Sequence, residues 1–414
     1  MDLIIIPFHD WRKAEKKGIC DRDQHLIAHF RKDSRIEKIL IVDRPISIPE
    51  MFVNKMPWRI KKGNVIEKGF CYCLTEIDKK TFVLDFLRGD VITPLFLKRN
   101  WLYFAFGDKS MAKAVKRAMR TISVTNPVVF LWNPFATGLA KRLDAELLVY
   151  DAMDNWLKHA EMKKSRKYLE KSYAYVSQNA DIIFSVSEKM QGVFSGAKAG
   201  YKAVIKNGVD REFFSRGKRE IPEDIKDIKK PIVGYAGRMG LRIDRELLEY
   251  LAGELPDLSF VFIGAYINKK WMKPLFRFSN LYFLGDKHYS ELPSYLSCFD
   301  VCIIPHNVGR LENDGDPIKV YEYLAAGKPV VTTGITGMDA LREVITVADT
   351  KQDFKNGILR LLEQIKKDPS LPARLRGYIS EKHLWSAKAR EMADTMLRAV
   401  SEGQGLFNDI KSRK

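Results

Sequence analysis

The stretch that decides the fold is Asp314–Gly334, which reads DGDPIKVYEYLAAGKPVVTTG. Pro317 suits the first position of a helix, where its missing N–H costs nothing, and Asp316 before it can cap that helix. Gly327 suits the left-handed residue that ends a helix, and PVVTT is typical of a buried parallel strand. The stretch therefore predicts a short helix followed by a strand of an α/β domain.

The same predicted helix carries groups that suit a nucleotide diphosphate. Lys319 and Glu322 lie three residues apart and so share one face of the helix. A helix N-terminus attracts phosphate through its unpaired N–H groups and its dipole, and Lys319 in the first turn adds a full charge. Glu322, one turn further on, can accept two ribose hydroxyl groups. Together with Pro317, these residues predict a nucleotide-diphosphate site at the start of the helix.

This stretch resembles the signature of the GT-B glycosyltransferases, especially glycosyltransferase family 4 and its teichuronic-acid and exopolysaccharide types. The signature is an acidic residue, seven further residues, and then Glu before GKPVV. Asp314 and Glu322 stand at the two acidic positions, although the first acid is usually Glu. NGVDREFF at 207–214 resembles the family's junction between domains, and GYAGRMG at 234–240 resembles its glycine loop. The resemblance covers most of the chain.

Strands alternate with helical segments in both halves of the chain, which is typical of parallel, doubly wound sheets. At 414 residues the chain is long enough for two domains. We expect an N-terminal acceptor-binding domain at 1–208, a linker at 209–229 and a donor-binding domain at 230–385. The resemblance implies a GT-B fold, in which two Rossmann-like domains face a central cleft. It also implies that a last helix at about 386–414 packs back on the first domain.

The resemblance and the glycine loop imply further residues for the nucleotide-sugar donor. Gly237 lets backbone N–H groups approach a phosphate, and Arg238 stands where the family has a diphosphate-binding Arg. The family's Lys five residues later is replaced by Ile243, so Arg242 beside it or Lys319 could compensate.

The nucleobase segment of the family corresponds here to the end of the strand NLYFL. Gly285, Asp286 and Lys287 stand there and are expected to seat the base mainly through backbone groups. UDP is expected from its frequency in the family, and GDP stays open.

Sugar transfer from a nucleotide requires that the growing charge on the leaving diphosphate be neutralised. Arg238, Lys319 and the helix that begins at Pro317 suit this task without a metal, so we expect no metal and no other cofactor. Asp314 is expected to contact a sugar hydroxyl and not to serve in a metal-binding DxD motif.

Two further carboxylates, Asp151 and Asp154 in VYDAMDNW, end a predicted strand of the first half. The segment resembles the Y-D-x-x-D of cell-surface polysaccharide enzymes. In an inverting mechanism Asp154 would take the proton from the acceptor hydroxyl, with Asp151 on the acceptor side. In a retaining mechanism Asp154 would contact a sugar, and a helix cap is the non-catalytic alternative. His306 could line the cleft or be structural.

The net charge of +18 is unevenly placed along the chain. Residues 1–208 hold 37 Lys and Arg against 23 Asp and Glu, which leaves residues 209–414 with 33 against 29. The first half therefore carries +14 and the second half +4. Anionic lipid, a polyanionic or lipid-diphosphate acceptor, or nucleic acid would each complement such a surface.

The segment 111–123, MAKAVKRAMRTIS, predicts an amphipathic helix. An apolar stripe containing Met111 and Val115 lies apart from the cations, and Trp101 stands in the aromatic-rich segment before it. The cations of this helix are Lys113, Lys116, Arg117 and Arg120. We expect an interfacial anchor for an anionic cytoplasmic leaflet, or a helix that covers its own core with solvated cations outside.

Other features narrow the class of protein. There is no apolar window of about 18 residues and no basic leader, so we expect a cytoplasmic protein that is peripheral to the inner face of the membrane. The five cysteines lack metal-site spacing, which favours reduced thiols.

The expected function is transfer of a sugar from a UDP-sugar to a lipid-linked or cell-surface polysaccharide. A nucleotide-sugar epimerase is the enzymatic alternative. A basic nucleic-acid-binding protein is the non-enzymatic alternative, although no specific nucleic-acid-binding motif supports it. The oligomeric state stays open.

Overall fold

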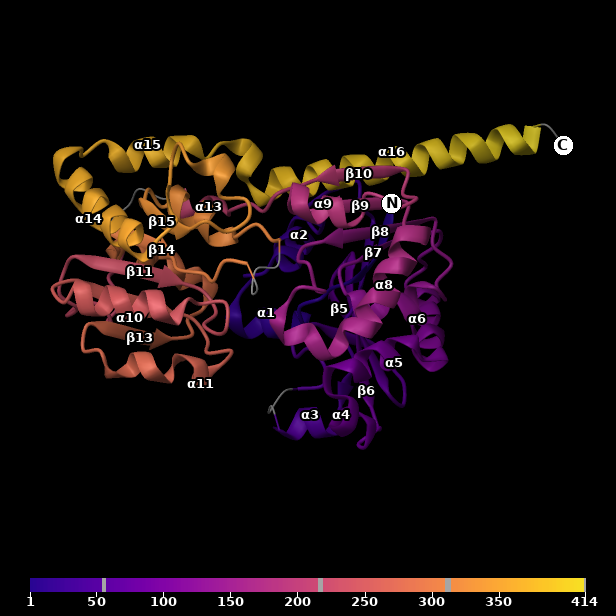
Figure 1. The fold of residues 1–414 in the computed structure, drawn as a ribbon. Coiled ribbons are helices and arrows are strands. Elements are labelled where there is room, and N and C mark those ends of the chain that lie inside the picture. Colours follow the sequence, from indigo (N-terminus) through magenta and orange to yellow (C-terminus); the bar gives the residue numbers. More distant parts are fainter. Residues whose placement is uncertain (54–56, 215–218, 310–313, 413–414) are drawn as a thin grey trace. The chain divides into compact units, whose positions relative to one another are not determined.

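The structure is a computed structural model that describes residues 1–53, 57–214, 219–309 and 314–412. The chain forms two compact units, whose elements are labelled in Figure 1. The first contains Met1–Leu157, Glu161–Ile205 and the residues from Lys388 onward, and the second contains Lys158–Ala160 and Lys206–Ala387. Among the helices described, none is both long enough and apolar enough to cross a bilayer.

A ten-stranded sheet forms the first unit, with the strand order β10-β9-β8-β7-β1-β2-β6-β5-β4, and β3 also pairs with β6. All pairs are parallel except β4 with β5 and β5 with β6. The strands are β1 Asp2–Ile6, β2 Lys38–Val42, β3 Ile46–Ser47, β4 Asn64–Lys68, β5 Tyr72–Asp78, β6 Thr81–Arg88, β7 Val128–Leu131, β8 Leu147–Ala152, β9 Ile182–Ser185 and β10 Tyr201–Val204.

Helices follow the parallel strands of the first unit, as crossover connections require. They are α1 Trp11–Lys17, α2 Arg22–Phe30, α3 Ile48–Val53, α4 Thr93–Leu97, α5 Trp101–Gly107, α6 Lys109–Thr121, α7 Thr137–Ala140, α8 Arg166–Asn179 and α9 Glu188–Val193. The sheet is buried at its centre, because helices cover both faces of a parallel sheet: Leu3, Ile4 and Ile5 of β1 are fully buried.

The second unit has a six-stranded parallel sheet with the order β13-β12-β11-β14-β15-β16. Its strands are β11 Ile232–Ala236, β12 Ser259–Ile263, β13 Leu281–Gly285, β14 Val301–Ile304, β15 Val330–Thr333 and β16 Thr346–Ala348. Its helices are α10 Arg245–Glu254, α11 Lys269–Met272, α12 Leu292–Cys298, α13 Ile318–Ala325, α14 Lys351–Lys367 and α15 Leu371–Tyr378.

Alternate residues of the second sheet belong to two separate apolar cores. On β11, Val233 and Tyr235 pack in one core, whereas Ile232 and Ala236 pack in the other. Successive side chains of a strand point to opposite faces, so each face of the sheet has its own core. This is the doubly wound arrangement that the sequence predicted.

The last helix, α16 Trp385–Ser412, is the long yellow helix of Figure 1. Its residues from Lys388 onward belong to the first unit. Arg35 and Asp394 form an exposed ion pair there, with Nη1 and Oδ1 2.5 Å apart.

The stretch that predicted a helix and a strand forms α13 and β15. Gly327 follows the helix with φ 72°, the left-handed conformation expected of it. The predicted cap from Asp316 is wrong, because Pro317 holds the N-cap position. The Asp316 carboxylate instead accepts hydrogen bonds from the hydroxyl of Tyr321 at 3.0 Å and from the backbone N–H of Asn207 at 2.7 Å. Asn207 of the NGVDREFF motif thereby holds the start of α13.

Candidate donor site and the residues of the first unit

The predicted donor residues other than those after β13 lie where the strand order of the second sheet reverses. β12 and β13 extend the sheet on one side of β11, whereas β14, β15 and β16 extend it on the other. In parallel α/β folds, ligands bind at the carboxyl ends of the strands beside such a reversal. The loop after β11 carries Gly237, Arg238 and Arg242, and the segment after β14 leads to Lys319 and Glu322 of α13. The fold brings two distant segments to one edge of the sheet.

Lys319 crosses the glycine loop. A Cβ atom at position 237 would lie 2.8 Å from the Cε atom of Lys319 and 3.1 Å from its Nζ atom. The same Nζ atom lies 5.4 Å from the ring centroid of Tyr235. A larger residue at position 237 would therefore displace the end of the Lys319 side chain.

The two arginines of this site act on the charge of Lys319. Burial lowers the pKa of Lys319 to about 8, and the charges of Arg242 and Arg238 lower it as well, whereas Glu322 raises it. Like charges held close together disfavour the charged state of Lys319 until an anion compensates them. The cluster of Arg238, Arg242 and Lys319 therefore suits a ligand with several negative charges.

The position of the family's missing Lys is a packing position in this chain. Ile243 is fully buried, and its backbone pairs with that of His306. The backbone N–H of Asn307 donates a 2.8 Å hydrogen bond to the carbonyl of Arg242. These contacts join the two segments that carry the site and hold Arg242 within electrostatic range of Lys319.

His306 is a buried imidazole below this cluster. Its Nε2 atom lies 3.2 Å from the hydroxyl of Tyr235, and the residue is only 3% exposed. Burial lowers the pKa of His306 well below its usual value, and the charges of Lys319 and Arg242 lower it further. Of the two interpretations that the sequence leaves open, these contacts favour the structural one.

Glu322, the predicted ribose-binding residue, is 5% exposed. Its Oε1 atom accepts a 2.8 Å hydrogen bond from the hydroxyl of Tyr289. Tyr289 follows β13 and was missed from the sequence, although it stands only two residues after the predicted base segment. The hydrogen bond from Tyr289 therefore orients the carboxylate of Glu322 within the site.

Asp314, the predicted sugar-binding residue, is buried and has φ 53°, which is uncommon for a residue other than glycine. Its carboxylate lies 2.9 Å from the ammonium of Lys158, which belongs to the same unit. The sugar contact of Asp314 stays a prediction, made by a carboxylate that already has a cationic partner.

The predicted base segment follows β13. Gly285 has φ 74°, and its carbonyl accepts a 2.8 Å hydrogen bond from the N–H of Gly264. The ammonium of Lys287 donates a 2.5 Å hydrogen bond to Asp224, whereas the side chain of Asp286 is exposed. The expected contact of this segment with the base, mainly through backbone groups, stays a prediction.

In the first unit, Asp151 has a structural ion pair in place of the predicted acceptor contact. The carboxylate is fully buried at the end of β8. The guanidinium of Arg22 binds both oxygens, at 2.7 and 3.1 Å, and the indole N–H of Trp132 donates a 2.6 Å hydrogen bond to one of them. With these three donors and no exposed surface, the carboxylate is held inside the fold.

Asp154 lies just beyond the end of β8 and is partly buried. The ring of Trp156, two residues further on, stacks on Phe8 with centroids 4.1 Å apart. The loop after β8 therefore packs on the loop after β1, as the carboxyl ends of parallel strands in one sheet allow. The role of Asp154 as the catalytic base stays a prediction.

The loop after β1 also contains an ordered His–Asp pair that the sequence interpretation missed. The Nδ1 atom of His9 lies 2.9 Å from the buried carboxylate of Asp23, which also accepts hydrogen bonds from the backbone N–H groups of Phe8 and His9. Asp21 approaches the other ring nitrogen at 3.5 Å. The signal in the sequence is the His-Asp dipeptide that directly follows the first buried strand.

The predicted interfacial anchor is corrected in part. Trp101 is buried at 5% exposure, so it is a core residue. Met111 and Val115 of α6 are fully buried, which is the alternative in which the helix covers its own core. Lys116 pairs with Asp144 at 2.7 Å. Of the predicted cations, Lys113, Arg117 and Arg120 are exposed.

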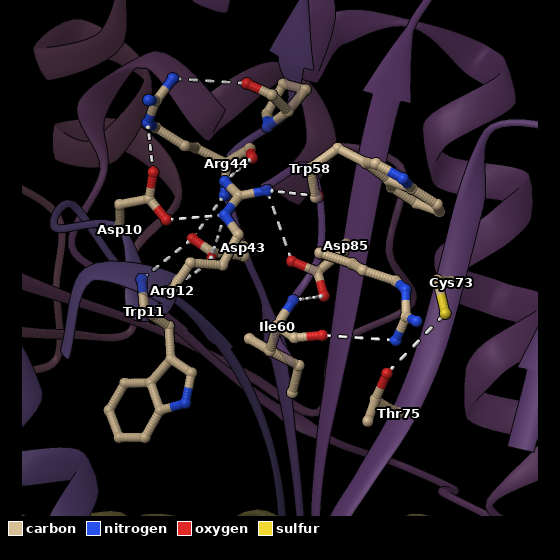
Figure 2. A network of polar contacts seen from close by, with 12 residues as sticks. Asp10, Trp11, Arg12, Asp43, Arg44, Trp58, Ile60, Cys73, Thr75 and Asp85 are labelled. Atoms are coloured by element: carbon tan, nitrogen blue, oxygen red, sulfur yellow. Dashed lines mark hydrogen bonds and ion pairs between the residues drawn. The ribbon is translucent and has the colours of Figure 1, made fainter. Parts of the chain in front are cut away.

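A buried ionic network lies elsewhere in the first unit (Figure 2). The guanidinium of Arg12 donates a 2.8 Å hydrogen bond to Asp10 and lies 3.3 Å from Asp43 and 3.4 Å from Asp85. The second arginine, Arg44, reaches Asp10 at 3.1 Å. The three aspartates come from segments at β1, β2 and β6, so the network ties together three neighbouring strands.

The three aspartates of this network ionise differently. Burial raises the pKa of Asp85 to about 6 against the charge of Arg12, and it also raises the pKa of Asp43. Burial of Asp10 is outweighed by the charges of Arg12 and Arg44, which lower the pKa of that carboxyl group. Although three aspartates converge, no group of His, Cys, Asp and Glu side chains in the described residues is arranged to hold a metal ion. The expectation that the protein uses no metal stays a prediction.

Comparisons with known proteins agree with the sequence analysis. Residues 230–364 match the family model described as Glycosyl transferases group 1. A protein of Bacillus subtilis (strain 168), whose name assigns it to teichuronic acid biosynthesis as glycosyltransferase TuaH, is 27% identical over 208 residues. That alignment covers 47% of this chain and 52% of the relative, so the chain spans about half the length of this curated relative.

Solved structures resemble the chain over nearly its full length. Sucrose-phosphate synthase from Thermosynechococcus elongatus has a TM-score of 0.71 at 14% identity, covering 97% of this chain and 100% of that one. Alr3699/HepE of Anabaena, in complex with UDP-glucose, has a TM-score of 0.62 at 15% identity, covering 96% and 100%. These likenesses confirm the predicted GT-B fold, and the family match confirms the predicted resemblance to glycosyltransferases.

Proposed function

We propose that this chain, a glycosyltransferase whose residues 230–364 form a group 1 domain, moves a sugar from a UDP-sugar to a lipid-linked or cell-surface polysaccharide acceptor. The observation that carries the proposal is the cluster of Arg238, Arg242 and Lys319 beside Glu322 at the reversal of strand order. UDP is favoured over GDP because Alr3699/HepE was solved with UDP-glucose.

The cations would act on the leaving diphosphate. As the bond between the sugar and the phosphate breaks, negative charge grows on the phosphate oxygens, and cations held in place beforehand stabilise it. The charge of Arg242 helps to lower the pKa of Lys319, and the diphosphate would relieve that repulsion. No metal would be needed, so turnover should survive EDTA.

Glu322 would hold the ribose of the donor. A carboxylate accepts from both hydroxyl groups of a ribose, and the bond from Tyr289 orients it while leaving acceptor capacity. This role predicts a loss of binding when the carboxylate is removed, for any sugar attached to the nucleotide.

In an inverting reaction, a carboxylate of the first unit would take the proton from the acceptor hydroxyl. Asp154 is the proposed base, because it follows the end of β8 and its side chain is partly exposed. Asp151 is not proposed, since Arg22 holds its carboxylate.

The protein would bind its acceptor at the cytoplasmic face of a membrane. Among the described residues, ten of the seventeen large apolar side chains that are exposed lie between residues 52 and 104. Phe96 of α4 is 81% exposed and Leu95 is 64% exposed. Exposed apolar side chains in a basic unit suit an anionic bilayer, at whose interface they would be inserted.

Titration calorimetry of the full chain with UDP and GDP tests the donor proposal. UDP should bind more tightly than GDP, and Glu322→Ala should weaken UDP binding at least tenfold, which is about 1.4 kcal/mol. Glu363→Ala, on the exposed surface of α14, is the matched control and should leave binding unchanged. No binding of UDP, GDP or any sugar nucleotide to the folded wild-type chain would end the proposal.

A further inference from the structure

Two polar clips fasten helix α6 to the antiparallel part of the first sheet. At the start of the helix, the guanidinium of Arg88 on β6 binds the carboxylate of Asp108 at 2.5 Å. Near its end, Glu67 of β4 accepts hydrogen bonds from Arg117 and, at 2.6 Å, from the hydroxyl of Thr121. These two polar contacts lie at the ends of α6, so a space can remain between the middle of the helix and the sheet.

A pocket of about 260 Å³ lies at this place. Its walls include Tyr72 and Phe86, which are directly opposite on β5 and β6, and Ala114, whose small side chain leaves room on the helix side. Phe70 also lines the pocket and is fully exposed to solvent. The volume and the apolar walls suit a single hydrocarbon chain.

The remaining wall of the pocket is cationic. Arg88, Lys113 and Arg117 all line it. Arg88 and Arg117 form ion pairs with the carboxylates of Asp108 and Glu67, so these two cations are neutralised. Within the part of the chain that the structure describes, Lys113 has no carboxylate partner, so the pocket has a net positive charge at the exposed surface of α6.

From these features we infer that the pocket binds one anionic amphiphile. Its hydrocarbon chain would lie against Tyr72, Phe86 and Ala114, and its anionic head, a phosphate or a group of similar charge, would pair with Lys113. Each methylene removed from water contributes about 0.8 kcal/mol, so a chain adds affinity that the charge alone lacks. The inference concerns binding to the first unit and does not depend on the donor or on sugar transfer.

A cysteine inside the pocket allows a direct test without turnover. Cys71 lines the pocket and is half-buried, and Cys20 before α2 is also half-buried but lies outside the pocket lining. The rate at which iodoacetamide alkylates each thiol of the full chain is followed by peptide mass spectrometry. Dodecyl phosphate, kept below its micelle-forming concentration, should slow alkylation of Cys71 at least fivefold and leave Cys20 unchanged.

Two further probes decide which part of the amphiphile is recognised. Inorganic phosphate should not protect Cys71, because it has no chain, and dodecyl maltoside should protect it at least fivefold less effectively, because its head is neutral. Equal protection by the maltoside would overturn the anionic part of the inference, and protection by phosphate alone would overturn the role of the chain. No protection by dodecyl phosphate would overturn the whole.

Exposed side chains provide variants that leave the core untouched. Lys113→Ala should raise the dodecyl phosphate concentration for half-protection at least fivefold, and Lys113→Arg should restore it. Lys109→Ala, at an exposed position of the same helix outside the pocket lining, is the matched control and should match the wild type. Equal effects of Lys113→Ala and Lys109→Ala would mean that only the general charge of α6 attracts the amphiphile, and would contradict the inferred site.

Discussion

Lys319 lies across Gly237, with its Cε atom 2.8 Å from the place that a Cβ atom of residue 237 would occupy. The two residues are far apart in the sequence, yet the ammonium that is proposed to meet the diphosphate rests on the backbone of the glycine loop. The glycine is therefore needed for the position of a side chain as well as for access of a phosphate to the backbone. A change at either residue should disturb the other.

Gly237→Ala should weaken UDP binding at least tenfold, because the added methyl group displaces the Lys319 ammonium. Titration calorimetry measures the loss. Gly253→Ala in α10 is the control, since a Cβ atom there would meet nothing within 4 Å. That variant should bind UDP normally and be more stable by up to about 1 kcal/mol, because Ala favours a helix over Gly. Wild-type affinity in Gly237→Ala would contradict the proposed place of Lys319 in the site.

UDP affinity should fall as the pH rises through about 8. Burial and the charges of Arg242 and Arg238 lower the pKa of Lys319 to about 8 in the protein without ligand. Below that pH the ammonium is charged and attracts the diphosphate, and above it the amine is neutral. A single group can change the affinity by at most about tenfold per pH unit. Calorimetry between pH 7 and 9 measures this slope.

Lys319→Arg provides the control for this pH dependence. An arginine stays charged over the whole range, so its UDP affinity should be nearly constant between pH 7 and 9. If the wild type and Lys319→Arg lose affinity in parallel, another group titrates and the assignment to Lys319 is wrong.

The elements whose signals are local could be predicted from the sequence. Residues 314–334 contain their own helix start, helix stop and apolar strand, and they form α13 and β15 as predicted. Even here, the partner of Asp316 could not be predicted, because Asn207 lies 109 residues away and contacts it only in the folded chain.

The antiparallel part of the first sheet was missed for a similar reason. β5 and β6 are joined by a turn at 79–80 with two lysines and no glycine or asparagine, so the usual hairpin signal is absent. Arg22 and Asp151 are 129 residues apart, and nothing in either local sequence identifies the other as its partner. Local patterns predicted which carboxylates stand at strand ends. Only the folded structure shows which of these carboxylates is bound by a distant cation.

The buried network of the first unit should make stability depend on pH between about 4 and 6. The pKa of Asp85 is raised to about 6 in the folded protein, against about 3.9 in an unfolded chain. The folded state therefore holds more protons than the unfolded state in this window. The free energy of unfolding should fall as the pH rises, by about 2 kcal/mol from Asp85 between pH 4 and 6 and by about 3 kcal/mol over its whole titration. Asp43, whose pKa is also raised, should add to the slope.

Urea unfolding of the full chain at pH 4, 5 and 6 measures this dependence. Asp85→Asn should make the slope shallower, because the asparagine cannot take up the proton. Asp144→Asn is the control, since its carboxylate is exposed and pairs with Lys116 at the surface. A slope that is unchanged in Asp85→Asn would show that other groups cause the pH dependence.

Asp151 and Asp154 should respond differently to the same substitution, although only two residues separate them. Asp151→Asn leaves Arg22 buried without its counter-charge, which should destabilise the folded chain by about 3–5 kcal/mol in urea unfolding. Asp154→Asn removes a partly exposed carboxylate, so the free energy of unfolding should change by less than about 1 kcal/mol. Because the proposed base is lost, release of UDP from the sugar nucleotide in the presence of acceptor should slow about 10²–10⁴-fold. UDP affinity should be unchanged in Asp154→Asn, because the donor residues belong to the second unit. A stable Asp151→Asn would contradict the structural ion pair. A fully active Asp154→Asn would exclude Asp154 as the base.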